Sequence, residues 1–209
     1  MACRVVCISR EAGAGGEQVG RLVADELGWT YVDDEIVARA AASAGVQAGR
    51  IEGEERGRSL ARRALDAIAA GGAGSPPGVG PSTQLPSHDA GVELQPFVRE
   101  AVAEAVSRTN VVIVAHAASF AVEQTGSALR VLLTASPETR AARLGEEQGL
   151  ADGDAARAVK SSDAGRREYL KRFHGVDREL PTHYDLVLNT DTLDVERAAQ
   201  IVAHAARLA

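Results

Sequence analysis

The stretch Arg4–Leu27, RVVCISREAGAGGEQVGRLVADEL, decides the fold of this chain. It opens with a short, mostly β-branched run without glycine or proline, which predicts a buried strand. A glycine-rich turn follows at Gly13–Gly16, and the apolar residues after it recur at helical spacing until Gly28, a typical helix stop. Strand, glycine turn and helix in this order indicate a phosphate-binding loop. Glycines let the backbone approach a ligand, and the free N–H groups of a helix start attract anions.

The loop departs from the Walker A pattern G-x-x-x-x-G-K-S/T. Gly15 fits the second glycine, but Arg10 stands at the position of the first glycine and Gly16 at that of the lysine. Depending on the register, Glu17 or Gln18 replaces the hydroxyl residue that ligates magnesium. The sequence therefore predicts a phosphate site that lacks its usual lysine.

Length and composition indicate a single domain. The chain has 209 residues, of which 45% are hydrophobic and 3% aromatic, so its core must consist of Val, Leu, Ile and Ala. The net charge of −6 argues against a general nucleic-acid binder. We find no secretory signal and no apolar stretch near the roughly 20 residues of a membrane span, and we expect a cytoplasmic protein.

Cysteine and histidine positions suggest neither a disulfide nor a metal site. Cys3 and Cys7 share one strand and would lie roughly 13 Å apart at about 3.3 Å per residue, too far for a disulfide. We expect buried, reduced thiols. The five histidines have no metal-ligand spacing.

Five short apolar runs predict strands: Val5–Ser9, Thr30–Asp33, Asn110–Ala115, Leu129–Thr134 and Asp185–Thr190. Val111–Val114 in the third run and Val131–Leu133 in the fourth are continuously apolar, which favours burial on both faces. Helical patterns separate the runs, and this alternation predicts a parallel sheet with right-handed crossovers and the first run near its centre.

Three further helices are expected. Ser136-Pro137-Glu138 supplies an N-cap, a proline at the first helical position and an early acid. Either Thr192 or Asp194 opens the last helix, Val195–Leu208, and Arg58–Ala70 is another amphipathic candidate.

Two segments stand out by composition. Gly71–Gly91 holds six glycines and four of the seven prolines, which predicts a mobile insertion, either a surface linker or a substrate cover. Arg157–Arg178 carries seven Arg or Lys against three acids. This local basic cluster suits an anionic small ligand or a solvated helix face.

Six stretches form a pattern in their order and spacing: Ile8–Glu11 running into Gly13–Gly16, Tyr31–Glu35, Val112–Val114, Ala135–Arg143, Asp163–Asp177 and Tyr184–Thr190. In this pattern the chain resembles the cytidylate kinase-like family, relatives of bacterial CMP kinase. The resemblance implies a three-layer α/β P-loop kinase-like fold with a five-stranded parallel sheet. It also implies one domain over 1–209, with a helical lid over 151–178.

The resemblance further implies ATP-dependent transfer of a phosphoryl group to a pyrimidine nucleoside monophosphate. ATP and Mg²⁺ would be the cofactors, and nucleotides the partners. The cofactor-binding loop would comprise Gly13, Ala14, Gly15, Gly16, Glu17 and Gln18. Catalysis would fall to Asp33, Arg166 and Arg172, and substrate binding to Arg39 and Lys160.

Other interpretations of these residues stay open. Asp33-Asp34 also fits a strand end with a helix N-cap, and Arg39 a surface helix position. His116, just past a buried strand, suits packing or capping as well as catalysis. Arg140 and Arg143 match a helix signature of the family in which a structural role is possible.

Three cationic residues that the family places near phosphates are missing here or replaced by other residues, in one case by an acid. The loop lysine is missing, Glu17 stands where the family often has arginine, and Ala115-His116 replaces a frequent Gly-Arg. Arg10 and Arg21 are the candidates to compensate. In the lid, spacing by three predicts that Asp163 pairs with Arg166 or Arg167 and that Arg172 serves a ligand.

Two functional hypotheses follow. One is an active nucleotide kinase, and the other is a catalytically impaired relative that acts as a nucleotide sensor or interaction module. A nicotinamide-dependent oxidoreductase does not fit, because G-x-G-x-x-G from Gly13 would need a glycine at Gln18. A hydrolase is disfavoured because there is no G-x-S-x-G elbow.

Overall fold

The computed structural model describes residues 3–33, 110–115, 118–121 and 128–209. Most of them belong to one compact unit, which joins Met1–Tyr31 to Thr109–Ala209. Almost all of a second unit, Val32–Arg108, lies outside the described residues. The predicted helix 58–70 and the predicted mobile insertion 71–91 fall outside the described residues too, and they stay predictions.

Five strands form one sheet in the order β2-β3-β1-β4-β5. β1 pairs in parallel with both β3 and β4, and β4 pairs in parallel with β5. The predicted central position of the first strand is confirmed. Each predicted strand agrees to within one residue at either end with the observed bounds: Val5–Arg10 for β1, Thr30–Asp33 for β2, Val111–Ala115 for β3, Ala128–Thr134 for β4 and Leu186–Asn189 for β5.

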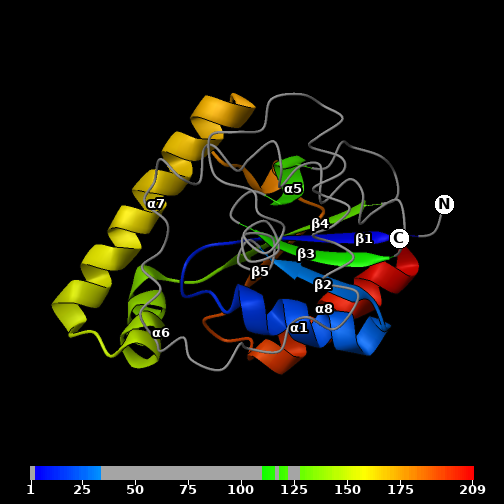
Figure 1. Ribbon diagram of the computed structural model, residues 1–209, viewed down its shortest axis with the longest axis horizontal. Helices are drawn as coiled ribbons and strands as arrows, with labels where there is room; N and C mark the ends of the chain where they lie inside the picture. The colour runs from blue at the N-terminus through cyan, green and yellow to red at the C-terminus, as the bar shows by residue number, and fades with distance from the viewer. Residues whose placement is uncertain (1–2, 34–109, 116–117, 122–127) are drawn as a thin grey trace, which may run out of the picture. The chain divides into compact units, whose positions relative to one another are not determined.

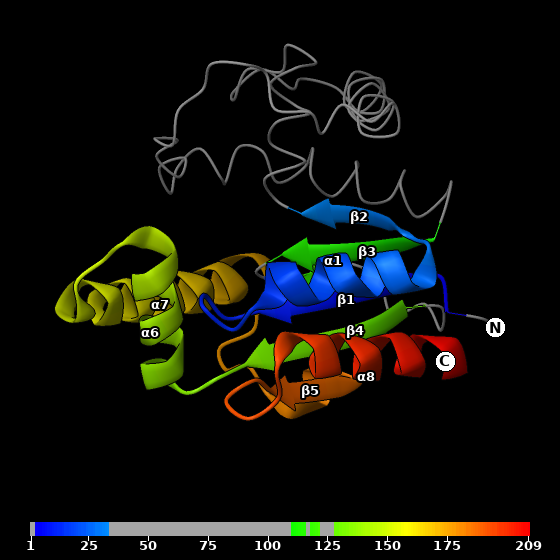
Figure 2. The ribbon, with the colours of Figure 1, turned by 90° about the horizontal axis from the view of Figure 1, so that it is seen from below.

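Helices lie on both faces of the sheet (Figure 1). α1 (Gly16–Leu27) and α8 (Val195–Leu208) pack together on one face, and the short α5 (Ala118–Ala121) contacts the other. α6 (Pro137–Gln148) and α7 (Asp152–His174) pack against each other beyond the carboxyl ends of the strands (Figure 2). The predicted three-layer α/β fold is thus confirmed.

Two helix starts follow the expected signals. The Ser136 hydroxyl caps α6 by accepting a hydrogen bond from the Thr139 N–H at 3.3 Å, and a proline takes the first helical position. Asp194 caps α8 by accepting from the Arg197 N–H at 2.8 Å. Of the two residues that could open the last helix, Thr192 and Asp194, the structure selects Asp194.

The main core lies between the sheet and the layer formed by α1 and α8. Val6 and Ile8 of β1 pack there with Val19 and Val23 of α1 and with Val202 of α8. These side chains are fully buried, and the contact fixes where α1 begins relative to the end of β1. Among the described residues, no helix has the length and apolar character needed to cross a membrane.

β4 departs from the predicted burial on both faces. Val111–Val114 of β3 are buried throughout, as expected, whereas buried and half-buried residues alternate along β4. Half-buried Leu132 lies in register with Ser9, whose hydroxyl bonds Ser119 of α5. In the described part of the chain, the helix on this face is four residues long. It therefore covers β4 less fully than α1 and α8 cover the opposite face.

Candidate functional site

The candidate site is the loop between β1 and α1, at the carboxyl end of the central strand. Gly13 and Gly15 have φ angles of 78° and 79°, in the left-handed region that favours glycine. Gly15 is the N-cap of α1 and makes no side-chain hydrogen bond to the helix start. The first-turn N–H groups are thus left uncapped by this residue, which is an arrangement that attracts an anion.

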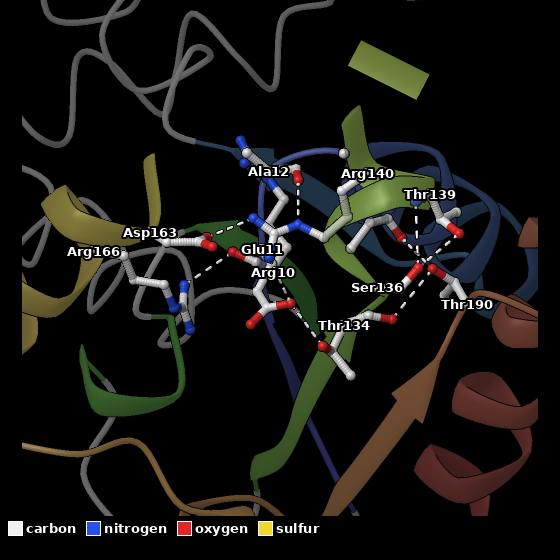
Figure 3. Close-up of polar contacts among 12 residues, drawn as sticks. Arg10, Glu11, Ala12, Thr134, Ser136, Thr139, Arg140, Asp163, Arg166 and Thr190 are labelled. Carbon is white, nitrogen blue, oxygen red and sulfur yellow. Dashed lines mark hydrogen bonds and ion pairs between the residues drawn. The ribbon is translucent and has the colours of Figure 1, made fainter. Parts of the chain in front are cut away.

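Two arginines of α6 hold the loop on its carbonyl side, and Figure 3 shows the contact of one of them, Arg140, with Ala12. Arg140 is 2% exposed and donates Nε to the Ala12 carbonyl at 2.9 Å and Nη1 to Glu11 Oε2 at 3.1 Å. Arg143 donates to the Gly13 carbonyl at 3.3 Å. The fit is tight, because a Cβ on Gly13 would lie 2.5 Å from the Arg140 carbonyl oxygen. The contacts of both arginines support the loop.

Arg10 and Glu17 meet over the start of α1. The Arg10 guanidinium forms an ion pair with the Glu17 carboxylate in the first helical turn. The Arg10 side chain lies against Gly16, where a Cβ would come within 2.6 Å of the Arg10 Cβ. Arg10 thus brings a cation next to the residue at the lysine position. Arg21, the other candidate to compensate, has its guanidinium carbon 4.7 Å from the centroid of the Tyr31 ring.

Arg166 of α7 lies in a buried polar cluster. It is 6% exposed and donates Nε and Nη2 to the two carboxylate oxygens of Glu179, at 2.9 and 2.5 Å. Its Nη1 donates to the Arg10 carbonyl at 2.9 Å, and the Tyr184 hydroxyl donates to the same Glu179 carboxylate. Arg166 is therefore buried in this structure, and its predicted catalytic role stays a prediction. It shares the buried stripe of α7 with residues such as Leu170.

Asp163 connects α7 to α6. Its carboxylate pairs with the Arg140 guanidinium at 2.5 Å, in place of the predicted partners on its own helix. Arg167 donates Nε to the backbone carbonyl of Asp163 at 3.3 Å instead. Because Arg140 also contacts the loop, the lid helix and the loop share one set of polar contacts.

The other predicted site residues lie on α7, at the end of β2 or outside the described residues. Lys160 and Arg172 are exposed on α7. Asp33 is the last residue of β2 and is buried. Arg39 and His116 fall outside the described residues, so their predicted roles stay predictions.

Three residues at the loop escaped the sequence-based prediction. Glu11 accepts hydrogen bonds from Arg140 and from the Thr134 hydroxyl, the latter at 2.6 Å. Glu179 is the partner of Arg166, and Thr190 donates its hydroxyl to the Ala14 carbonyl at 3.0 Å. One signal was present for Thr190, because it directly follows a parallel strand at the edge where such sheets bind ligands.

Three of the arginines around the loop, Arg10, Arg140 and Arg166, are paired with acids. The pairs are Arg10–Glu17, Arg140–Glu11, Arg140–Asp163 and Arg166–Glu179. Gln18 of the loop donates Nε2 to Glu147 of α6 at 3.1 Å. A polyanion bound at this loop would contact backbone N–H groups. The positive charge of one of these arginines would attract it fully only after that arginine had separated from its acidic partner.

The two cysteines are free, buried thiols. Burial raises the pKa of Cys7 to about 12, and it also raises the pKa of Cys3. Neither can serve as a nucleophile near neutral pH. In the ranges that the structure describes, no group of three or more His, Cys, Asp or Glu side chains is placed to hold a metal ion.

A sequence model of the cytidylate kinase-like family matches residues 5–192 of the chain. No curated protein matches it. Similar solved structures include an uncharacterized protein from Eubacterium ventriosum, with 16% identity, 97% of each chain covered and a TM-score of 0.63.

Two annotated kinases show the same fold at lower similarity. A shikimate kinase from Bacteroides thetaiotaomicron has 15% identity, 97% of each chain covered and a TM-score of 0.51. A gluconokinase from Sinorhizobium meliloti has 12% identity, a TM-score of 0.51 and coverage of 99% of this chain and 94% of its own. At these identities the structures establish the fold alone.

Proposed function

The chain belongs to the cytidylate kinase-like family, and from this membership we propose that it is an ATP-dependent nucleotide kinase that phosphorylates a pyrimidine nucleoside monophosphate. The observation that carries the proposal is the loop Gly13–Gln18, where two left-handed glycines precede a helix start without a side-chain cap. Such a loop suits the phosphates of a nucleotide.

The loop fits ATP by its backbone. Gly13, Ala14, Gly15, Gly16, Glu17 and Gln18 would surround the phosphates, and the Glu17 carboxylate opposes them unless Arg10 stays close. Mg²⁺ would neutralise charge on the transferred group, which is most of what phosphoryl transfer requires. Asp33 would hold the metal or the substrate hydroxyl.

The other predicted cations would bind the substrate or act in catalysis. Arg172 and Lys160 are exposed, so they are accessible to a ligand. Arg166 would contact a phosphate only after release from Glu179, which makes a catalytic role for Arg166 dependent on movement of α7. Arg39 would bind the substrate phosphate.

A second candidate function is a catalytically impaired nucleotide sensor or interaction module. It is favoured by the missing lysine and by the internal ion pairs of Arg10, Arg140 and Arg166. A lid arginine can contribute about 10³–10⁵ in rate where it has been isolated. Ion pairs between these arginines and acids of the protein would therefore suppress phosphoryl transfer. The backbone N–H groups of the loop would still be able to bind a nucleotide.

Calorimetric titration distinguishes the two candidates. The protein is titrated with ATP·Mg²⁺ and then with CMP, dCMP and UMP, and phosphoryl transfer is measured for each monophosphate. The kinase proposal expects binding of ATP and at least one monophosphate, with turnover. Binding without turnover supports the nucleotide sensor. Absence of binding of any nucleotide contradicts both the kinase and the sensor and leaves the interaction module.

A further inference from the structure

Every backbone carbonyl from Arg10 to Ala14 accepts a hydrogen bond. Four of the donors are side chains of other elements. Arg166 donates to the Arg10 carbonyl and Arg140 to the Ala12 carbonyl, each at 2.9 Å. Arg143 donates to the Gly13 carbonyl at 3.3 Å, and Thr190 donates to the Ala14 carbonyl at 3.0 Å. The Glu11 carbonyl accepts from the Ala14 N–H at 3.0 Å. The loop is thus held from its carbonyl side along its whole length.

Fixed carbonyls also fix N–H groups. In a planar trans peptide, the C=O of one residue and the N–H of the next point in opposite directions. By holding the Ala12 carbonyl, Arg140 turns the Gly13 N–H away from α6. Thr190 turns the Gly15 N–H away from itself in the same way. Among the described residues, neither of these two N–H groups donates to a backbone carbonyl.

The Thr190 hydroxyl has one hydrogen and two carbonyls within reach. The Ala14 carbonyl is 3.0 Å away and the Thr134 carbonyl 3.3 Å. The Thr134 carbonyl already accepts the Thr190 N–H at 2.8 Å, and Arg143 donates into the Thr190 hydroxyl oxygen at 3.0 Å. The hydroxyl hydrogen therefore goes to Ala14. At 1% exposure, Thr190 has little access to water as an alternative acceptor.

We propose that Thr190 and Arg140 are positioning residues of the phosphate loop, which aim the N–H groups of Gly15 and Gly13 at a bound anion through the carbonyls of Ala14 and Ala12. The inference rests on the proposed function and adds that residues from β5 and α6 set the shape of the anion site. Positioning matters more in this chain than in a loop with a lysine, because aimed N–H groups supply more of the attraction.

Thr190→Val and Thr190→Ser test the proposal. Valine keeps the volume and removes the hydroxyl, whereas serine keeps the hydroxyl. Inorganic tripolyphosphate is the probe, titrated by calorimetry. We expect about tenfold weaker binding for Thr190→Val, the effect of one lost hydrogen bond, and binding within about twofold of the parent for Thr190→Ser. The amide resonance of Gly15 should shift in the valine variant and not in the serine variant.

Thr139→Val is the matched control. It removes a hydroxyl that accepts from Ser136 Oγ at 3.0 Å and does not touch the loop, so tripolyphosphate binding should not change. A folded Thr190→Val variant that binds like the parent would overturn the proposal. So would a serine variant that loses as much affinity as valine, or a parent that does not bind tripolyphosphate.

Arg140→Lys keeps the proposal testable if Thr190→Val does not fold. A lysine keeps the charge but cannot make the three directed contacts of Arg140, so the Gly13 amide resonance should shift and tripolyphosphate binding should weaken. An unchanged resonance and affinity would refute the role of Arg140. Absence of phosphoryl transfer, with tripolyphosphate binding and these effects intact, would count against the kinase proposal alone.

Discussion

Glu17 pairs with the guanidinium of Arg10 at the first turn of α1, so the cation that lies against the lysine position already has an anionic partner within the protein. The two side chains are unequally covered, with Glu17 42% exposed and Arg10 16%. The pair is therefore within reach of solvent on the Glu17 side, and an incoming phosphate would compete with Glu17 for Arg10.

Replacement of Glu17 should tighten nucleotide binding. Glu17→Arg removes a carboxylate near the phosphates, releases Arg10 and adds a cation, so ATP should bind more tightly. The gain should shrink at high salt, because exposed charges are screened. Calorimetry with ATP·Mg²⁺ at low and high salt measures both effects, and Glu17→Gln should show an intermediate gain. Unchanged or weaker binding at every salt concentration would mean that the loop is not a phosphate site.

Loss of Arg166 should lower stability as well as turnover. Arg166→Ala leaves the half-buried Glu179 carboxylate without its cation, and because the loss of one partner of a fully buried pair costs about 3–5 kcal/mol, we expect a loss of stability up to that size. Arg207→Ala is the control, because Arg207 forms an exposed pair with Glu26 that contributes under about 1 kcal/mol. Urea denaturation of both variants gives the comparison, with turnover measured below the unfolding transition. Equal stabilities of the two variants would contradict a stabilising role of the Arg166–Glu179 pair.

Gly13→Ala should destabilise the protein more than Gly28→Ala. Both glycines have positive φ angles, 78° and 65°, and a left-handed conformation costs a non-glycine residue about 1–2 kcal/mol. A Cβ on Gly13 would also press on the Arg140 carbonyl, whereas one on Gly28 meets nothing within 4 Å. Thermal unfolding measures the difference. A similar loss of stability in the two variants would show that the loop can shift around the Arg140 carbonyl at little cost.

Acid should weaken the contact between Asp185 and Arg130. Hydrogen bonds from Arg130, at 2.7 and 3.1 Å, hold the pKa of the Asp185 carboxyl below its usual range. A lowered folded-state pKa means that the stabilisation is complete above the unfolded pKa of about 4 and is lost as the pH falls through the folded value. The melting temperatures of the parent and Asp185→Asn should therefore differ at neutral pH and converge in acid. A difference that persists into strong acid would refute the assignment.

Most of the fold could be predicted from the sequence because its signals are local. The β-branched runs Val5–Ser9 and Asn110–Ala115 define buried strands by composition, and Ser136 and Asp194 cap helices through neighbours three residues away. The glycine turn was predictable for the same reason. Its backbone conformation depends on residues that are adjacent in the chain.

The site's supporting contacts were not predictable in this way. Helical spacing indicates that Asp163 and Arg166 share a side of α7, but it does not tell which side is buried. That depends on Glu179, Tyr184 and the end of β1, which the fold brings together from distant parts of the sequence. An arginine in a basic segment suggests a solvated or ligand-binding role until its buried partner is known.

The central place of β1 has a consequence for how the protein is made. β1 is synthesised before either of its neighbours, and its first partner residues are Val111 on β3 and Ala128 on β4. On the ribosome, β1 and the loop that follows it therefore have no strand partner on either edge until much of the chain has been translated. Non-local pairing of this kind slows folding and exposes strand edges to aggregation. Nascent chains truncated before β4 are thus expected to need a chaperone that covers β1.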